Sequence, residues 1–192
     1  MAEKNQFEIL QQVLQQFYSA GVLKDIMLIG SWCLYFYRQE FENPKSIPAV
    51  RTLDADFLIP SQRKIETQFD IPSALRDLGF APTFNHSNGL VVYDHPQLRI
   101  EFLIPEIGKG FDDKPQDIKK LHVKAIGLRY LNLLADHPRL ISYQNFKIKV
   151  PEPSVFAIHK LIISQRRSKE DKRERDLAAA VGVLDYVYST GA

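Results

Sequence analysis

The sequence is poor in cysteine and has no long apolar run. Cys33 is its only cysteine among 192 residues, which excludes an intrachain disulfide and fits a reducing compartment. No apolar run approaches the roughly 20 residues that a membrane-spanning helix needs, and the opening residues MAEKNQFEIL lack the apolar core of a signal peptide. We therefore expect a cytoplasmic protein with no membrane partner.

A strong charge of either sign is also missing. The chain has 25 Lys and Arg against 23 Asp and Glu, a formal net charge of +2, so any attraction to nucleic acid or anionic lipid has to be local. The hydrophobic fraction of 45% and the charged fraction of 25% are near the average for soluble globular proteins, which argues against a disordered chain. The length suits one domain, or one domain with a small appendage.

The first third of the chain reads as helix, strand and helix. Apolar residues at helical spacing predict an amphipathic helix over residues 5–20. The apolar stretch 25–30 predicts a short strand that ends at Gly30, and Ser31 is a candidate N-cap for a helix over residues 32–41. Strand, tight turn and helix therefore follow one another without a linker.

Prolines and glycines divide the middle of the chain. Two prolines in NPKSIPAV, residues 43–50, predict an irregular loop before the strand TLDADFLIP, residues 52–60. A helix is expected over residues 71–80. Two hairpins are expected over residues 89–105 and 139–150.

The pattern changes to helix after Pro151. Apolar stripes predict one helix over residues 154–165 and another from about residue 169 to 188. We therefore place a boundary near residue 150, with a catalytic domain over 1–150 and a helical region over 151–192 packed on it. The expected fold class is α+β: a mixed, mostly antiparallel sheet flanked by helices, with a C-terminal helical hairpin.

Three carboxylates lie in the two most apolar predicted strands. Side chains alternate along a strand, so Asp54 and Asp56 project from one face, with α-carbons about 6.5–7 Å apart. The later strand LRIEFLIP repeats the pattern with Glu101. If the two strands are neighbours, Glu101 completes a cluster of three acids, and such a cluster repels itself unless a cation is present.

A cluster built only from carboxylate oxygens suits a hard cation such as Mg²⁺ or Mn²⁺. Two such ions about 3.5–4 Å apart can activate an attacking hydroxyl and neutralise a leaving pyrophosphate, which is phosphoryl-transfer chemistry. An isolated Asp-x-Asp is weak evidence, because Asp54 and Asp56 could instead pair with Arg51 and Arg99 at a strand end.

The turn that precedes these strands favours a metal and phosphate site over simple pairing with arginines. Gly30 lets the backbone approach a ligand closely, and Ser31 offers a hydroxyl beside the exposed amides at the start of a helix, where anions bind readily. Taken alone, the pair also reads as an ordinary strand-to-helix turn with a serine cap. A phosphate cradle followed by a metal cluster makes one coherent site.

In these residues the sequence resembles the nucleotidyltransferase superfamily that includes DNA polymerase beta, which has a Gly-Ser turn, an Asp-x-Asp strand and a third acid on a later strand. The stretches IGSWCLY and RTLDADF, and VPEP followed by HKL, also resemble bacterial nucleotidyltransferase-like proteins of minimal or toxin-related type. The resemblance implies a mixed sheet flanked by helices, Mg²⁺ dependence and transfer of a nucleoside monophosphate from a nucleoside triphosphate. It assigns metal binding and catalysis to Asp54, Asp56 and Glu101.

A basic segment follows in the predicted helices. Residues 160–175 hold seven basic and three acidic side chains, and they could form a solvated helix face with pairs one turn apart. Alternatively, Lys160, Arg166 and Lys172 contact a triphosphate or a nucleic-acid backbone. The resemblance favours nucleotide binding by Gly30, Ser31, Lys160 and Lys172, with Asp176 as the partner of the basic residues. The adjacent His159 is expected to be packed in the interior.

The leading hypothesis is therefore an Mg²⁺-dependent nucleotidyltransferase. Its acceptor could be RNA, including tRNA, or a protein or a small molecule, and the oligomeric state stays open. The rival hypothesis is a non-catalytic nucleotide-binding or interaction module that retains the fold.

Overall fold

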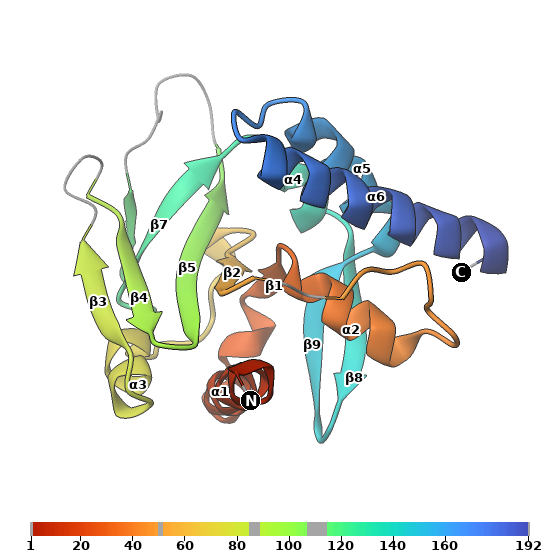
Figure 1. Ribbon diagram of the computed structural model, residues 1–192. Helices are drawn as coiled ribbons and strands as arrows, with labels where there is room; N and C mark the ends of the chain where they lie inside the picture. Colours follow the sequence, from red (N-terminus) through yellow and green to blue (C-terminus); the bar gives the residue numbers. More distant parts are fainter. Residues whose placement is uncertain (1, 50–51, 85–88, 107–114, 192) are drawn as a thin grey trace.

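The computed structural model describes residues 2–49, 52–84, 89–106 and 115–191 of the chain, with backbone alone for residues 2–5 (Figure 1). In chain order the elements are α1 (Ala2–Ser19), η1 (Val22–Lys24), β1 (Met27–Ile29), α2 (Trp32–Glu40), β2 (Asp54–Leu58), η2 (Gln62–Lys64), α3 (Ile71–Asp77), β3 (Ala81–Phe84), β4 (Val91–His95), β5 (Leu98–Pro105), β6 (Gln116–Ile118), β7 (Val123–Leu128), α4 (Leu131–Ala135), β8 (Pro138–Tyr143), β9 (Phe146–Pro151), α5 (Pro153–Ser164) and α6 (Glu170–Thr190).

Strand β5 is the centre of the main sheet. It pairs in parallel with β2 and β7 and antiparallel with β4. Strands β1, β3 and β6 pair antiparallel with β2, β4 and β7 respectively. The sheet is therefore mixed, with more antiparallel than parallel pairs among the described strands, and the expected α+β fold is confirmed.

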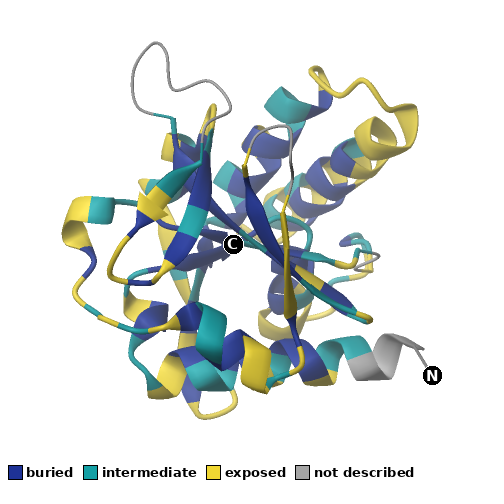
Figure 2. Ribbon diagram, turned by 90° about the vertical axis from the view of Figure 1, so that its left-hand side faces the viewer, coloured by how far each residue is buried: buried dark blue, intermediate teal, exposed yellow. Residues whose placement is uncertain are grey.

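The two faces of the sheet have different partners. Alternation places Ala55, Phe57 and Phe102 on one face, in a large core with α1, α3 and the β8–β9 hairpin. The opposite face carries a smaller cluster in which Leu58 and Leu103 pack with residues of α4. Figure 2 shows these buried segments meeting inside the molecule, with exposed residues on the outer sides.

Both predicted hairpins are confirmed. Strands β4 and β5 are joined at Pro96 and Gln97, and β8 and β9 are joined at Gln144 and Asn145. Gln144 has a φ of 53°, a left-handed conformation that a tight two-residue turn requires. The proline and turn residues therefore located these connections correctly.

The predicted C-terminal helices are confirmed as α5 and α6, which lie side by side at the upper right of Figure 1. Buried residues from both helices join the same large core as α1 and the sheet. The division at residue 150 stays a prediction. Within the described residues, no helix combines the length and the apolar character needed to cross a membrane.

The core predicts that substitution of a buried residue and of an exposed residue four positions away will change stability by different amounts. Phe57 is fully buried between Phe17 and Phe102, whereas Leu53 is 58% exposed. We expect Phe57→Ala to lower the free energy of unfolding by about 3–5 kcal/mol. Leu53→Ala should change it by less than about 0.5 kcal/mol. Urea denaturation measures both, and equal losses would contradict the packing described.

Candidate functional site

The pairing of β2 with β5 brings the predicted acids together. The parallel register sets Asp56 opposite Glu101 and Asp54 opposite Arg99. Because residues paired in this way point to the same face, the three carboxylates share the face opposite to Phe57 and the large core. They are half-buried there, with part of each side chain accessible.

Gly30 lies directly against Asp56. Its φ is +73°, and a Cβ added at this position would stand 2.4 Å from Asp56 Oδ2. Both the left-handed backbone and this close approach require glycine. Strand β1 ends beside Asp56 because Ile29 pairs with it, so the Gly30 turn and the carboxylates are parts of one constellation.

Ser31 precedes α2 as predicted, but it does not cap the helix with its side chain. It has an αR backbone conformation, and its hydroxyl makes no capping hydrogen bond. A serine cap normally has an extended backbone that turns its oxygen toward the first amides. The N-cap prediction was therefore wrong for the side chain, although Ser31 stands where a helix begins.

A cavity of about 670 Å³ opens over these residues, and all seven predicted site residues line it: Gly30, Ser31, Asp54, Asp56, Glu101, Lys160 and Lys172. Helix α6 and the segment before it add Arg167, Arg175 and Asp176, and β5 adds Arg99. Sequence reasoning noted most of these charged residues only as members of a basic segment or as possible partners. Their meeting in one cavity depends on the placement of α6 across it from β2 and β5.

Burial and mutual repulsion raise the proton affinity of the acids. Burial, followed by the charge of Glu101, raises the pKa of Asp56 to about 7, against the opposing charge of Lys160. Burial, followed by the charge of Asp54, also raises the pKa of Glu101, while Arg99 opposes this rise. The cluster therefore favours a bound cation or a bound proton.

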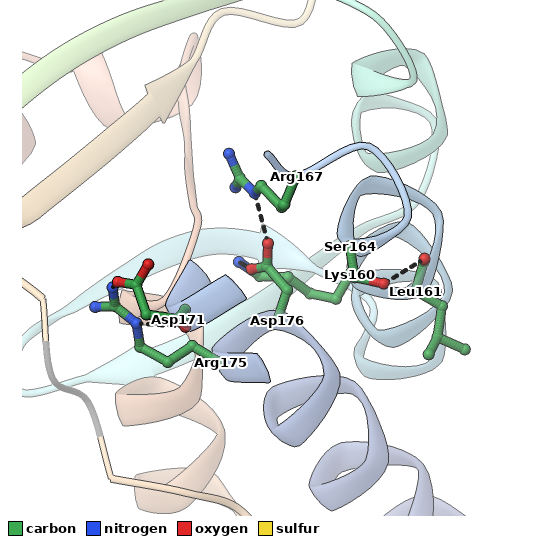
Figure 3. Close-up of polar contacts among 7 residues, drawn as sticks. All are labelled: Lys160, Leu161, Ser164, Arg167, Asp171, Arg175 and Asp176. Carbon is green, nitrogen blue, oxygen red and sulfur yellow. Dashed lines mark hydrogen bonds and ion pairs between the residues drawn. The ribbon is translucent and has the colours of Figure 1, made fainter. Parts of the chain in front are cut away.

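Asp176 links two basic side chains beside the acids (Figure 3). Lys160 Nζ donates to Asp176 Oδ1 at 2.6 Å, and Arg167 Nε donates to Asp176 Oδ2 at 2.8 Å. Burial acts to raise the pKa of Asp176, but Lys160 and Arg167 together hold it below its ordinary value. The predicted pairing of Asp176 with Lys160 is confirmed, and Arg167 is the second partner.

The other basic residues of the segment have different surroundings. Lys172 is exposed at the cavity, where its charge acts on Glu101. Arg175 pairs with Asp171 one turn earlier on α6 (Figure 3). Arg166 instead stacks over Tyr130, with its guanidinium carbon 5.1 Å from the ring centre, and it does not line the cavity.

The alternative that arginines pair with the two aspartates is tested at Arg99, whose charge interacts with that of Asp54 but whose ion pair is with another carboxylate. Arg99 Nε donates to Asp94 Oδ1 at 2.6 Å, on the neighbouring strand. Arg51 lies outside the described residues. The carboxylates of Asp54 and Asp56 are thus left beside the cavity.

His159 is packed in the interior, as predicted. It is 7% exposed, and its Nε2 has no hydrogen-bond partner. Burial, followed by the charge of Lys160, lowers its pKa to about 4. A histidine that stays neutral at physiological pH and lies in the interior is poorly placed for proton transfer in the cavity.

The carboxylates suit a hard divalent cation in their chemistry, because oxygen ligands are what Mg²⁺ and Mn²⁺ prefer. The missing Cβ of Gly30 leaves space beside Asp56 Oδ2. Over the described parts of the chain, however, no three His, Cys, Asp or Glu side chains converge closely enough to hold a metal ion. The donor types fit a cation, although the carboxylates do not form a complete coordination site among the described residues.

Comparison with known proteins assigns the chain to a family. The model of one protein family, described as Nucleotidyltransferase, matches residues 8–191. Among curated proteins, none matches the chain. The family assignment therefore rests on the match to the family model.

The comparison with solved structures gives the following similarities. An antigenic nucleotidyltransferase-like protein from Paracoccidioides brasiliensis is 16% identical, over 91% of this chain and 73% of that chain, with a TM-score of 0.48. The antibiotic-resistance factor ANT(2″)-Ia in solution is 9% identical, over 98% and 92% of the two chains, with a TM-score of 0.47. Its crystal structure with adenylyl-2″-tobramycin is 10% identical, over 98% and 99%, with a TM-score of 0.47.

The raised pKa of Asp56 predicts how stability depends on pH. The folded protein keeps the Asp56 proton up to about pH 7, whereas the unfolded chain releases it near 3.8. Between these values the folded state binds more protons, so its stability falls as pH rises. Asp56→Asn removes this loss, and we expect a thermal midpoint at pH 8 in EDTA that is higher by at least roughly 3 °C.

The control for this prediction is Asp117→Asn, since the Asp117 side chain is 68% exposed. Thermal unfolding followed by circular dichroism from pH 4 to pH 8 measures both variants. If Asp56→Asn lowered the midpoint at pH 8, the inferred repulsion among the acids would be wrong.

Proposed function

Because the chain belongs to the nucleotidyltransferase family, we propose that it transfers a nucleoside monophosphate from a nucleoside triphosphate to an acceptor hydroxyl in this cavity. The observation that carries the proposal is the meeting of three carboxylates with the Gly30 turn and Lys160 in one cavity. A phosphate site beside an acidic cluster is what phosphoryl transfer requires.

In the proposed reaction the acceptor oxygen attacks the α-phosphorus, and the bond to the bridging oxygen of the β-phosphate breaks. Pyrophosphate leaves, and the proton of the acceptor hydroxyl passes to Glu101. The raised pKa of Glu101 supports this role, because a carboxylate that holds a proton more tightly is a better base near neutral pH.

Asp54, Asp56 and Glu101 would hold Mg²⁺ or Mn²⁺ through their carboxylate oxygens. A divalent ion bound there supplies charge neutralisation at the phosphates and lowers the pKa of the attacking hydroxyl. The in-register pairing of Asp56 with Glu101 supports this assignment, because it sets two carboxylates side by side.

The β- and γ-phosphates would lie at Gly30 and Ser31, where the start of α2 presents backbone amides. Lys160 would add a positive charge whose position is held by Asp176. Lys172, exposed at the cavity, is proposed as a second contact for the nucleotide. With these assignments, the leaving pyrophosphate would lie on the side of the carboxylates that faces Lys160 and Lys172.

The site predicts opposite effects on stability and activity. We expect Asp56→Asn to abolish pyrophosphate release and to weaken Mg²⁺-supported triphosphate binding, although it stabilises the fold. Glu101→Gln should lower kcat by roughly 10²–10⁴-fold, the usual contribution of a general base. Pyrophosphate-release assays and titration calorimetry measure these effects, with Asp117→Asn as the control.

The acceptor can be identified with labelled nucleoside triphosphates and cell extract. Label that appears in RNA, in protein or in a small molecule would identify the class of the acceptor. The Asp56→Asn variant should produce no labelled acceptor. An RNA acceptor predicts binding that weakens steeply with salt, because the basic segment 160–175 would contact the backbone. Triphosphate binding without any pyrophosphate release, across a broad set of acceptors, would favour the non-catalytic module instead.

A further inference from the structure

The loop between α2 and β2 is anchored on α6. Phe41 stacks on Tyr186 with ring centres 4.4 Å apart and planes 8° apart, and the Tyr186 hydroxyl donates to the Glu42 carbonyl at 3.1 Å. Ile47 is fully buried, and the Arg38 guanidinium donates a hydrogen bond to the Ile47 carbonyl. In Figure 1 this part of the loop runs beneath α6, so residues 41–47 are held in place.

Gly182 is the point of closest approach between the loop and α6. A Cβ at this position would stand 2.2 Å from the Ser46 carbonyl oxygen and 2.8 Å from Pro48 Cδ. The first contact is with backbone, which cannot turn aside like a flexible side chain. Any larger residue at position 182 would therefore push the loop away from the helix by roughly 1 Å before ordinary contact at 3.4 Å is reached.

This contact forms one end of the catalytic cavity. Pro48 and Ala49 of the loop line the cavity, and so do Ala178 and Ala179 of α6. Residues 178 and 179 lie one turn before Gly182, and therefore on the same side of the helix. The cavity thus extends along α6 toward the contact between Pro48 and Gly182.

The cavity has an uncharged lining near this contact. The lining residues Pro48, Ala49, Ala178 and Ala179 carry no charge. The three carboxylates and the lysine and arginine side chains line other parts of the same cavity. A nucleoside triphosphate has the same division, because its phosphates are charged while its base is flat and uncharged.

We infer that the wall formed by Pro48 on Gly182 holds the nucleoside part of the triphosphate and determines which nucleoside is accepted. This inference rests on the proposed function, because it concerns the same cavity. Gly182 does not touch the nucleotide and is a positioning residue. Pro48 is the specificity-determining contact, and the anchored residues 41–47 before it keep it in place.

The test uses Gly182→Ala and Pro48→Ala in the full chain. The first moves the wall outward, and the second removes part of it. For both variants we expect the Kd of the best-bound of the four common nucleoside triphosphates, with Mg²⁺, to rise on the order of tenfold, and the discrimination among the four to shrink. The Kd of inorganic tripolyphosphate should stay at the wild-type value, because this probe has no nucleoside.

Val181→Ala is the matched control, because Val181 neighbours Gly182 on α6 and is 60% exposed. It should bind all probes like the wild type. Circular dichroism confirms folding of each variant, and Pro48→Ala answers the question if Gly182→Ala does not fold.

Each outcome decides the inference. Wild-type affinities in both variants would overturn it and leave the proposed function standing. Equal weakening for nucleoside triphosphates and tripolyphosphate would also overturn it, because the wall would then act on the whole fold. A wild-type protein that binds no triphosphate would overturn the proposed function together with this inference.

Discussion

The parallel pairing of β2 with β5 is the constraint on which the rest of the site depends. It places Asp56 beside Glu101 on one sheet face, although burial and repulsion raise the pKa of both. A fold that served stability alone would separate these carboxylates or pair each of them with a basic side chain. The raised proton affinity shows that the cluster costs stability until a cation or proton is bound, a pattern common at functional sites.

The basic side of the cavity is ordered by one buried carboxylate. Asp176 is 5% exposed and accepts from Lys160 and Arg167, which come from α5 and the segment after it. The two cations therefore have fixed positions before any ligand arrives, and this lowers the entropic cost of binding. Acids on the sheet and basic side chains on the helices face one cavity because α5 and α6 stand across it from β2 and β5.

Two glycines allow the close approaches that shape this cavity. Gly30 brings the turn after β1 against the Asp56 carboxylate, and Gly182 brings the loop before β2 against α6. Gly30 was singled out in the sequence because it ends an apolar strand and precedes a serine. Gly182 lies inside an ordinary helical pattern. Its role depends entirely on contact with a loop more than 130 residues earlier in the chain.

Local patterns determined the hairpins, the main helices and the face that Asp54 and Asp56 share, because turn chemistry and side-chain alternation act over a few residues. They missed β3, whose residues are all exposed and show no alternation, and β6 and β7, which depend on pairing with each other. The sequence by itself determined which acids and bases were candidates. Only the tertiary structure decided the register of β2 on β5, the role of Asp176 and the wall at Gly182, because each needs contacts between segments far apart in the chain.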